Sequence, residues 1–336
     1  MNNFENVKLD RFMYKVSGKS FSEVLEGEDT SIDYKDTPYA DLDAYQRQLK
    51  RFDIKVSGKD SDCIDKFFRT TDSAALFPEY ISRAVYQGAQ ENDILSRIVS
   101  TVTNIEGMDY RTIFCPADDI NKVPAVINEG TYIPETKITT KENLVKLKKR
   151  GRVLSASYEA VRFQRLDLFT VVLKQIGAAI AKAELFDAID TLINGDGNGN
   201  FIEEFDTEAS GTLTYSDLVD FWNKFDPYKM TTIITSPDVL QQLLKMSEFR
   251  DAYTGLDFHS TGKLITPFGA ELYKSSNVEE GKLIGLDRNF SLEKVQCGNI
   301  ITEYDKLIDR QLERAAITTI SGFAKISQDA SKLLTV

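Results

Sequence analysis

The residues whose types and spacing could perform chemistry lie in one stretch, NGDGNGNFIEEFDTEASGTLTYSD, which runs from Asn194 to Asp217. A calcium-binding loop of the EF-hand type places oxygen ligands at positions 1, 3, 5, 7, 9 and 12, with glycine at position 6. The register from Asp206 fits best, with Gly211 and Asp217 at positions 6 and 12, whereas the register from Asn194 ends on Phe205, which has no carboxylate. The two registers abut with no room for a helix between them. We therefore expect no metal site and interpret the glycines as a helix stop followed by a polar connector.

No other stretch carries a recognisable catalytic set. Any catalytic triad or histidine metal site would have to use His259, because it is the single histidine of the chain. No Gly-x-Ser-x-Gly motif accompanies it. The glycine-rich NGDGNGN lacks the Gly-Lys-Ser/Thr of a phosphate-binding loop, and a helix is expected before it where a dinucleotide loop follows a strand. Cys63, Cys115 and Cys297 form no Cys-x-x-Cys pair, so we expect reduced, buried thiols. The sequence predicts neither an enzyme nor a cofactor.

Composition predicts a globular chain with two or three substructures, because its 336 residues are 42% hydrophobic and 28% charged. The net charge of -11 argues against attraction of the whole surface to nucleic acid or to an anionic membrane. The most apolar stretch, residues 166–193, is interrupted by Lys174, Lys182, Glu184 and Asp187, and the N-terminus does not have the form of a signal peptide. We expect a protein that stays in a cytoplasm-like compartment or is released by lysis.

The N-terminal residues 1–75 differ from the rest, since they are polar and show few core periodicities. They carry an acidic run made of Glu23, Glu26, Glu28, Asp29, Asp33, Asp36, Asp41 and Asp43. Within them RFMYKVSGK (residues 11–19) recurs as RFDIKVSGK (residues 51–59), which predicts two short strands, each closed by a turn. The repeat is either a duplicated docking element for a neighbouring chain or a pair of similar edge strands. The segment is an arm or an accessory module.

The middle of the chain predicts a long hairpin. A helix with Pro78 in its first turn and a strand at residues 100–105 precede it. Extended runs at residues 111–115 and 144–155 then flank a stretch rich in Pro, Asn, Gly and Thr that is too long for an ordinary turn. The return strand carries Lys146, Lys148, Lys149, Arg150 and Arg152. This basic strand either contacts an acidic neighbouring subunit or nucleic acid, or is a solvated edge strand guarded by lysines.

The second half predicts one long helix and then alternating helices and strands. Residues 165–193 carry an apolar stripe at three- and four-residue steps. Helices then start near Thr214 and Pro237, with a β-branched strand between them, and short strands follow up to residue 289. Residues 309–327 read as a long C-terminal strand anchored by Phe323 and Ile326. The predicted fold class is α+β.

Four motifs in order resemble those of tailed-bacteriophage major capsid proteins of the Hong Kong 97 type. They are VINEGTYIPE (residues 126–135), LKKRGRVLSASYEAV (147–161), IGAAIAKAELFDAIDTLINGDGNGN (176–200) and RAAITTISGFAKI (314–326). Each motif alone is common, but the succession of a basic strand, a long helix and a glycine-rich stop is more specific. The resemblance covers residues 70 to 330.

The resemblance implies a domain plan. It places an N-terminal arm or scaffold-like segment at residues 1–75, the peripheral domain with its spine helix at 76–111, 157–212 and 299–336, the E-loop hairpin at 112–156, and the axial domain at 213–298. The E-loop would lie on a neighbouring subunit, and its inter-subunit contacts would involve Lys137, Lys141, Lys146, Lys148, Lys149, Arg150 and Arg152. Some relatives crosslink lysine to asparagine between subunits, and Lys137 or Lys141 stands where such a lysine would lie.

The function that the resemblance implies is self-assembly into pentamers and hexamers, which form an icosahedral phage shell around double-stranded DNA. The partners would be further copies of the chain, a scaffolding protein, a portal, a maturation protease and DNA bound without sequence specificity, with no membrane. The protein would be assembled in the host cytoplasm and reside in the virion capsid. Two alternatives stay open: an encapsulin-like nanocompartment shell, and a calcium-binding protein that uses Asp206, Glu208, Ser210, Thr214 and Asp217.

Overall fold

The computed structural model describes residues 3–15, 19–91, 93–115, 138–250, 264–298 and 300–336, together with Val126, Glu129, Glu135 and Thr136. The chain divides into two compact units, and several long elements contribute to both. The first unit comprises Met1–Asn92, Lys149–Lys182 and Cys297–Ile320, and the second comprises Asp93–Lys148, Ala183–Gln296 and Ser321–Val336.

The first unit begins with short helices, which include α1 (Phe21–Glu28), α2 (Ala44–Arg51) and α3 (Thr71–Ala74). Each of the three starts with a capping box, in which the N-cap side chain and the side chain three residues later bond to each other's backbone amide. In α2 the pair is Asp43 and Gln46. Such caps allow helices of one or two turns to form where tertiary packing supplies the remaining stability.

The repeated RFxxKVSGK motif does not form two strands, so that prediction is wrong. Arg11–Lys15 is a 3-10 helix, whereas Arg51 is the last residue of α2. Asp53 then turns the chain with φ 52°, and Ile54 is buried in the core. The capping box of α2 sets the helical register through Arg51, and this local signal outweighs the similarity to the first copy.

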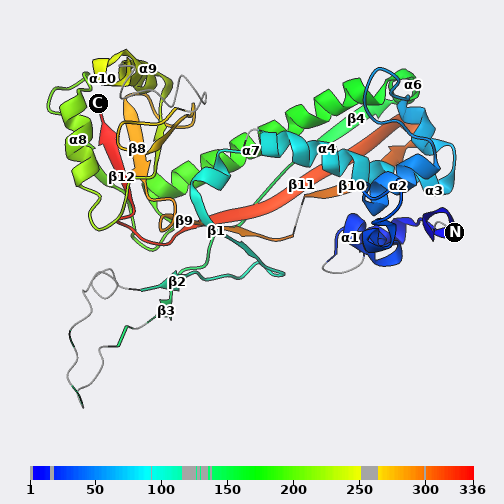
Figure 1. Ribbon diagram of the computed structural model, residues 1–336, viewed down its shortest axis with the longest axis horizontal. Coiled ribbons are helices and arrows are strands. Elements are labelled where there is room, and N and C mark those ends of the chain that lie inside the picture. Colours follow the sequence, from blue (N-terminus) through cyan, green and yellow to red (C-terminus); the bar gives the residue numbers. More distant parts are fainter. Residues whose placement is uncertain are drawn as a thin grey trace. The chain divides into compact units, whose positions relative to one another are not determined.

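Two long helices lie side by side in the first unit (Figure 1). They are α4 (Phe77–Glu91) and the part of α7 (Leu166–Asn194) up to Lys182, and both confirm the sequence prediction. Glycine makes this approach possible, because a Cβ on Gly88 would overlap the backbone of Lys174 and one on Gly177 would overlap the carbonyl oxygen of Val85. The helices therefore pack backbone against backbone.

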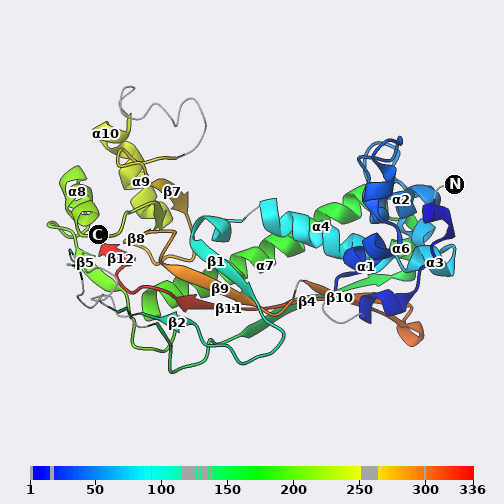
Figure 2. The same cartoon turned by 60° about the horizontal axis from the view of Figure 1, so that its bottom comes forward.

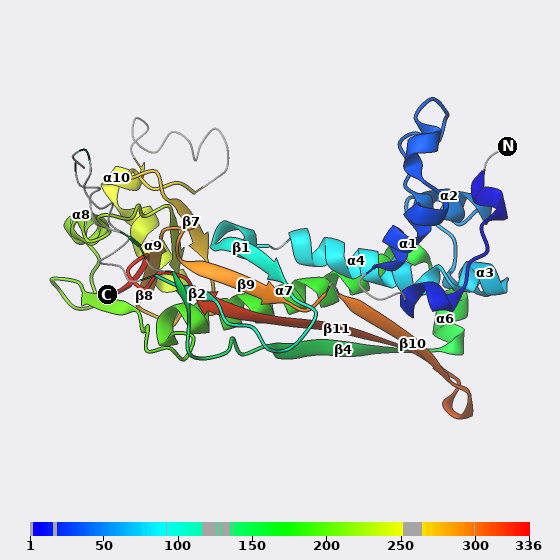
Figure 3. The same cartoon turned by 90° about the horizontal axis from the view of Figure 1, so that it is seen from below.

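A sheet completes the first unit. Strand β11 (Leu312–Lys325) pairs with β4 (Lys148–Ser157) on one side and antiparallel with β10 (Ile301–Leu307) on the other (Figure 3). Buried residues alternate along β11, with Ala315 and Ile317 facing the core that α4 and α7 share. A short helix, α6 (Tyr158–Phe163), follows β4 and is capped by Ser157.

In the second unit, β1 (Val99–Asn104) pairs parallel with β9 (Leu292–Gln296), and β9 pairs antiparallel with the end of β11. These strands share a core with the C-terminal part of α7, to which Leu185, Ile189 and Leu192 belong. Phe323, predicted as an anchor, is buried there, whereas Ile326 is half-buried.

A mixed sheet forms the rest of the second unit. Its strand order is β5 (Glu203–Asp206), β12 (Ser331–Thr335), β8 (Lys282–Leu286), β6 (Thr232–Thr235) and β7 (Glu271–Lys274). Helices α8 (Tyr215–Asn223) and α9 (Pro237–Lys245) share a core with this sheet, and the short α10 (Ser247–Arg250) follows (Figure 2). Thr214 caps α8 and Pro237 opens α9, as predicted. The α+β class is confirmed, and the domain boundaries stay a prediction.

The three cysteines are unbridged, but Cys63 is exposed and Cys115 and Cys297 are half-buried, so the expectation of buried thiols is wrong. Cys63 lies in a loop whose backbone bridges to Arg165, and this position leaves its side chain open to solvent. Within the part of the chain that the structure describes, no helix combines the length and apolar character that a membrane span requires.

Candidate subunit interface

The predicted extended hairpin begins as a two-stranded ribbon. Strand β2 (Ile113–Phe114) pairs antiparallel with β3 (Thr139–Thr140), which confirms the extended run expected at residues 111–115. The ribbon exposes apolar side chains, since Ile113, Phe114 and Ile138 are 56%, 45% and 69% exposed. A two-stranded ribbon is marginally stable by itself. The root of the hairpin must therefore hold it in place.

The segment that enters the hairpin is fastened to β9 by a buried carboxylate. Glu293 is 4% exposed and accepts hydrogen bonds from the hydroxyls of Thr103, Tyr110 and Thr112, the one from Tyr110 at 2.7 Å. Burial, together with the hydrogen bond to Glu293, raises the pKa of Tyr110. Because a buried carboxylate without partners is costly, these hydroxyls and Glu293 hold one another in place.

The segment that leaves the hairpin is fastened by a buried lysine. The Nζ of Lys141 lies 3.0 Å from Oδ2 of Asp196, and it also donates to the carbonyl oxygen of Lys325. Only 6% of the Lys141 side chain and 2% of the Asp196 side chain are exposed. The Lys141 backbone amide donates to the carbonyl oxygen of Thr112 at 2.9 Å, which joins the two segments at the root.

Asp196 belongs to the glycine-rich stretch that ends α7. The helix ends at Asn194, and Gly195, Gly197 and Gly199 adopt φ of 75°, 95° and 72°, so the predicted helix stop is confirmed. Positive φ at alternate residues turns the Asp196 carboxylate inward, where it also accepts from the backbone amide of Lys325 at 3.0 Å.

A second contact joins the helix stop to the hairpin root. The side-chain amide of Asn143 donates to the carbonyl oxygen of Gly197 at 2.8 Å, and its backbone amide donates to Oδ1 of Asn198 at 3.1 Å. The glycine-rich turn in the stretch that resembles a calcium loop therefore binds another segment of the same chain, the root of the hairpin. In the described part of the chain, no group of three or more His, Cys, Asp or Glu side chains is arranged to hold a metal. Asp217 instead accepts from the amide and hydroxyl of Thr214 in the cap of α8.

Two lysines and one aspartate therefore share the buried root. Burial lowers the pKa of Lys325 to about 8, although the negative charge of Asp196 acts in the opposite direction. The Lys325 ammonium donates to the carbonyl oxygen of Leu192 at 3.2 Å. For Asp196, burial alone would raise the pKa, but the hydrogen bonds from Asn198 and Lys141 outweigh it and lower the pKa. We name Lys141, Asp196 and Lys325 the root cluster.

The structure distributes the predicted contact residues between the two units. Lys137 lies outside the described residues, as does His259. Lys141 is buried in the root cluster, Lys146 is exposed, and Lys148 is 46% exposed and lies 2.7 Å from Asp187. On the part of β4 in the first unit, Lys149 and Arg152 are exposed and Arg150 is half-buried. The inter-subunit role of all seven basic residues stays a prediction.

Sequence reasoning missed most of the root. Glu293 carried no signal, because its partners lie between 181 and 190 residues away along the chain. Asp196 was visible between two glycines but was interpreted only as part of a helix stop. Lys325 stood in the predicted C-terminal strand, where nothing in the alternation of β11 distinguishes a buried lysine from a solvated one.

Comparison with known proteins shows what this chain is similar to. A family model described as phage capsid protein matches residues 140–304, a range that includes Lys141, Asp196 and Glu293. The fold is similar to a virus-like particle from Pyrococcus furiosus, at 15% identity and a TM-score of 0.51, covering 76% of this chain and 98% of that one. No curated protein sequence matches the chain. The chain therefore has the fold of Hong Kong 97-type capsid proteins, and about half of it matches the phage capsid family model.

Two further solved structures share the fold of this chain. The capsid of an empty GTA particle aligns at a TM-score of 0.53 with 15% identity, covering 72% of this chain and 88% of that one. A structure described as Gordonia phage Cozz aligns at 0.50 with 13% identity, covering 72% and 86%. These likenesses show a capsid-type fold, and the hairpin root is the candidate functional site in the part of the chain that the structure describes.

Proposed function

We propose that this chain is a phage capsid protein that joins its neighbours chiefly through the β2–β3 hairpin, and that the copies form pentamers and hexamers that close an icosahedral shell around double-stranded DNA. The contrast between the hairpin and its root carries this proposal. The hairpin exposes Ile113, Phe114 and Ile138, whereas buried contacts of Glu293 and Asp196 hold the root. Covering these apolar side chains with a neighbouring copy would stabilise the contact by about 25 cal/mol for each Å² of apolar surface buried.

Shell closure makes a modest contact sufficient. In a closed shell every copy both offers a hairpin and receives one, so contacts that are weak singly act together once several are formed. A rigid root favours association, because the base of the hairpin is already ordered and loses little conformational entropy when the hairpin binds. The root cluster therefore acts as a positioning device for the exposed ribbon.

We extend the proposal to the basic side chains that follow the hairpin. Among the described residues no strand pairs with the second edge of β4, on which Lys149 and Arg152 are exposed. Charged side chains on an open edge prevent uncontrolled strand pairing, and they also attract acidic surfaces. The net charge of -11 gives neighbouring copies such a surface. A crosslink through Lys141 would first require Lys141 to leave Asp196.

The remaining partners follow from the same proposal. An acidic subunit neutralises few phosphates, so we propose that DNA is packaged without a tight or sequence-specific site on each copy. Assembly in the host cytoplasm would involve a scaffolding protein, a portal and a maturation protease, and the subunit itself would act as neither an enzyme nor a cofactor carrier.

The test removes the hairpin tip and keeps the root. Residues 118–135 are replaced by a short Gly-Ser linker, which leaves Thr112, β3 and Lys141 in place. We expect a folded subunit with unchanged circular dichroism that forms no closed shells in negative-stain electron microscopy and sedimentation.

A point variant refines the same test. Ile113→Ser is compared with Leu244→Ser, which alters a 39% exposed leucine on α9 in the same unit. We expect fewer shells from the first variant and normal shells from the second. Normal shells from both the shortened hairpin and Ile113→Ser would refute the proposal.

A further inference from the structure

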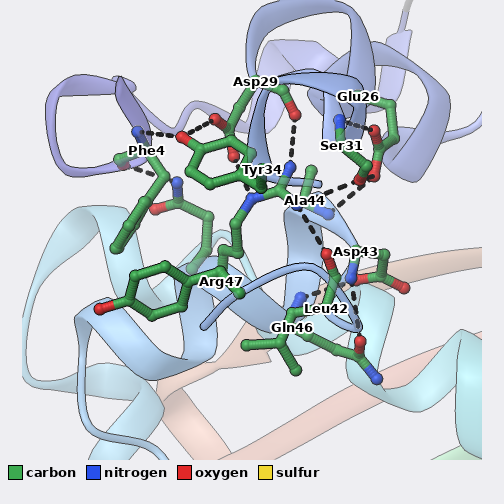
Figure 4. A network of polar contacts seen from close by, with 12 residues as sticks. Phe4, Glu26, Asp29, Ser31, Tyr34, Leu42, Asp43, Ala44, Gln46 and Arg47 are labelled. Atoms are coloured by element: carbon green, nitrogen blue, oxygen red, sulfur yellow. Dashed lines mark hydrogen bonds and ion pairs between the residues drawn. The ribbon is translucent and has the colours of Figure 1, made fainter. Parts of the chain in front are cut away.

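The described residues 3–15 and 19–75 form an N-terminal folded module built around a buried ion pair (Figure 4). Arg47 is 0% exposed and Asp29 is 1% exposed, and Nε of Arg47 lies 2.7 Å from Oδ2 of Asp29. The other guanidinium nitrogens donate to the carbonyl oxygens of Leu42 and Asp29, both at 2.6 Å, and to Ser31 Oγ at 3.0 Å. A buried guanidinium requires partners for its donors in a fixed geometry, which only a folded segment supplies.

The beginning of the chain is held within this module. Phe4 is 3% exposed, and its ring packs against those of Tyr34 and Tyr39. The Gln48 side-chain amide donates to the carbonyl oxygen of Phe4 at 2.7 Å, and the Phe4 amide donates to the Tyr34 hydroxyl at 3.2 Å. Phe4 is therefore part of the core of the module.

Polar contacts attach the module to α4. The Tyr14 hydroxyl donates to the carbonyl oxygen of Ala75 at 2.8 Å and accepts from the backbone amide of Glu79 at 3.0 Å. Arg83 of α4 lies 2.6 Å from a carboxylate oxygen of Asp43, the N-cap of α2. These contacts join side chains of the module to the backbone and the charged face of the helix that follows it.

The apolar core has no boundary between the module and the long helices. One buried cluster contains Phe21, Leu25, Tyr45 and Phe67 of the module together with Phe77, Tyr80, Leu166 and Leu173 of α4 and α7. The ring centroid of Phe67 lies 5.5 Å from those of both Phe77 and Tyr80. Loss of the module would expose the apolar faces of α4 and α7 to water.

The connection from the module to α4 is not a linker. Detachable segments are joined through exposed stretches that few contacts cross. Here the connection is buried, since Ala75, Leu76 and Phe77 are 1%, 0% and 3% exposed. Earlier in the module, the amide of Ile64 donates to the carbonyl oxygen of Gln164 at 3.0 Å, and the amide of Leu166 donates to that of Asp62 at 2.9 Å. Residues 57–60 of the module form an exposed turn, where Gly58 adopts φ 91°.

We infer that the N-terminal module is a permanent part of the shell subunit, retained in the mature particle, and is not an arm or scaffold-like segment that proteolysis releases. This inference rests on the proposed shell function. In this inference the module completes the hydrophobic core against which α4 and the first half of α7 pack. The virus-like particle from Pyrococcus furiosus covers 76% of this chain while 98% of that protein is matched, so this chain has room for such an addition to the shared fold.

The test cuts the chain without removing the module. A recognition sequence for a site-specific protease is inserted at Gly58, and the full-length protein is cleaved both as unassembled subunit and as shells. We expect the two fragments to co-elute in native gel filtration in both states and to separate only in denaturant. Release of the N-terminal fragment under native conditions would overturn the inference.

A second measurement addresses processing directly. Mass spectrometry of the subunit from mature particles should give a chain that still contains Phe4. A mature chain that begins near residue 75 would refute retention. If the intact protein forms no shells, the proposed function fails, but co-elution of the fragments of the cleaved subunit still decides whether the module is integral.

Discussion

Replacement of Asp196 by asparagine tests the idea that the root cluster holds the hairpin. The change keeps the size of the side chain but removes the one negative charge between Lys141 and Lys325. Removal of one partner from a buried ion pair costs about 3–5 kcal/mol, because the other charge is left buried. Asparagine retains an oxygen that can accept from Asn198, so we expect the lower end, about 3 kcal/mol, near pH 7.

The same charge balance predicts how this cost varies with pH. The pKa of Lys325 is already lowered to about 8 by burial, and Asp196 opposes that shift. Without Asp196 the Lys325 ammonium loses its proton at lower pH. The two lysines then no longer repel each other, so the destabilisation by Asp196→Asn should become smaller between pH 7 and pH 9.

Urea unfolding of the unassembled subunit measures the global effect, and amide hydrogen exchange measures the local one. The amides of Lys141 and Val145 donate to the carbonyl oxygens of Thr112 and Tyr110. A local loss of about 3 kcal/mol should accelerate their exchange about 100-fold. Asp190→Asn is the matched control, because the Asp190 carboxylate is 45% exposed and lies 3.9 Å from Lys148, and we expect less than about 1 kcal/mol from it. Equal effects of the two substitutions would refute the reasoning.

Two further predictions concern the two units separately. The pKa of Lys325 falls from 10.5 to about 8 on folding, so the unfolded chain binds this proton more tightly, and the free energy of unfolding should rise by about 3 kcal/mol between pH 8 and 10.5. Lys325→Met should lack this rise in urea titrations at several pH values, and an identical rise in both proteins would contradict the assignment. In the first unit Gly177→Ala should destabilise the subunit by about 1–3 kcal/mol, because its Cβ overlaps the carbonyl oxygen of Val85. Gly27→Ala in α1, where no atom lies within 4 Å of the new Cβ, should stabilise it by about 0.5–1 kcal/mol, and stabilisation by both in thermal unfolding would argue against the close packing of α4 and α7.

Local signals made the long elements predictable. Thr214 and Pro237 mark helix starts that the structure contains, and the stop after Asn194 follows from glycines that adopt positive φ. These features depend on residues within one or two turns of one another, so a single sequence displays them. The C-terminal strand was predictable for the same reason, since its alternation is visible over many residues.

The missed features depend on distant residues or on polar burial. The N-terminal module is built around a buried guanidinium and carboxylate, Arg47 and Asp29. Residues of these types usually lie on the surface, so hydrophobic periodicity did not reveal the core of the module. Strand β5 has the sequence EEFD, which does not favour a strand, and it pairs with β12, where Lys332 lies 2.5 Å from Glu203. In both places tertiary contacts override local preference, and only coordinates reveal the partner.

The helix stop and the hairpin root solve two problems with one set of residues. The end of a long helix leaves carbonyl groups that need donors, and Lys325 supplies one to Leu192. An extended hairpin also needs a fixed root. Lys141 fixes it by pairing with Asp196 in the turn that ends the helix and by donating to the carbonyl oxygen of Lys325. Because Asp196 is common to both, a displacement of the hairpin must disturb the end of α7. If the hairpin contacts a neighbouring copy as proposed, this coupling would transmit a displacement of that contact to the core of the second unit.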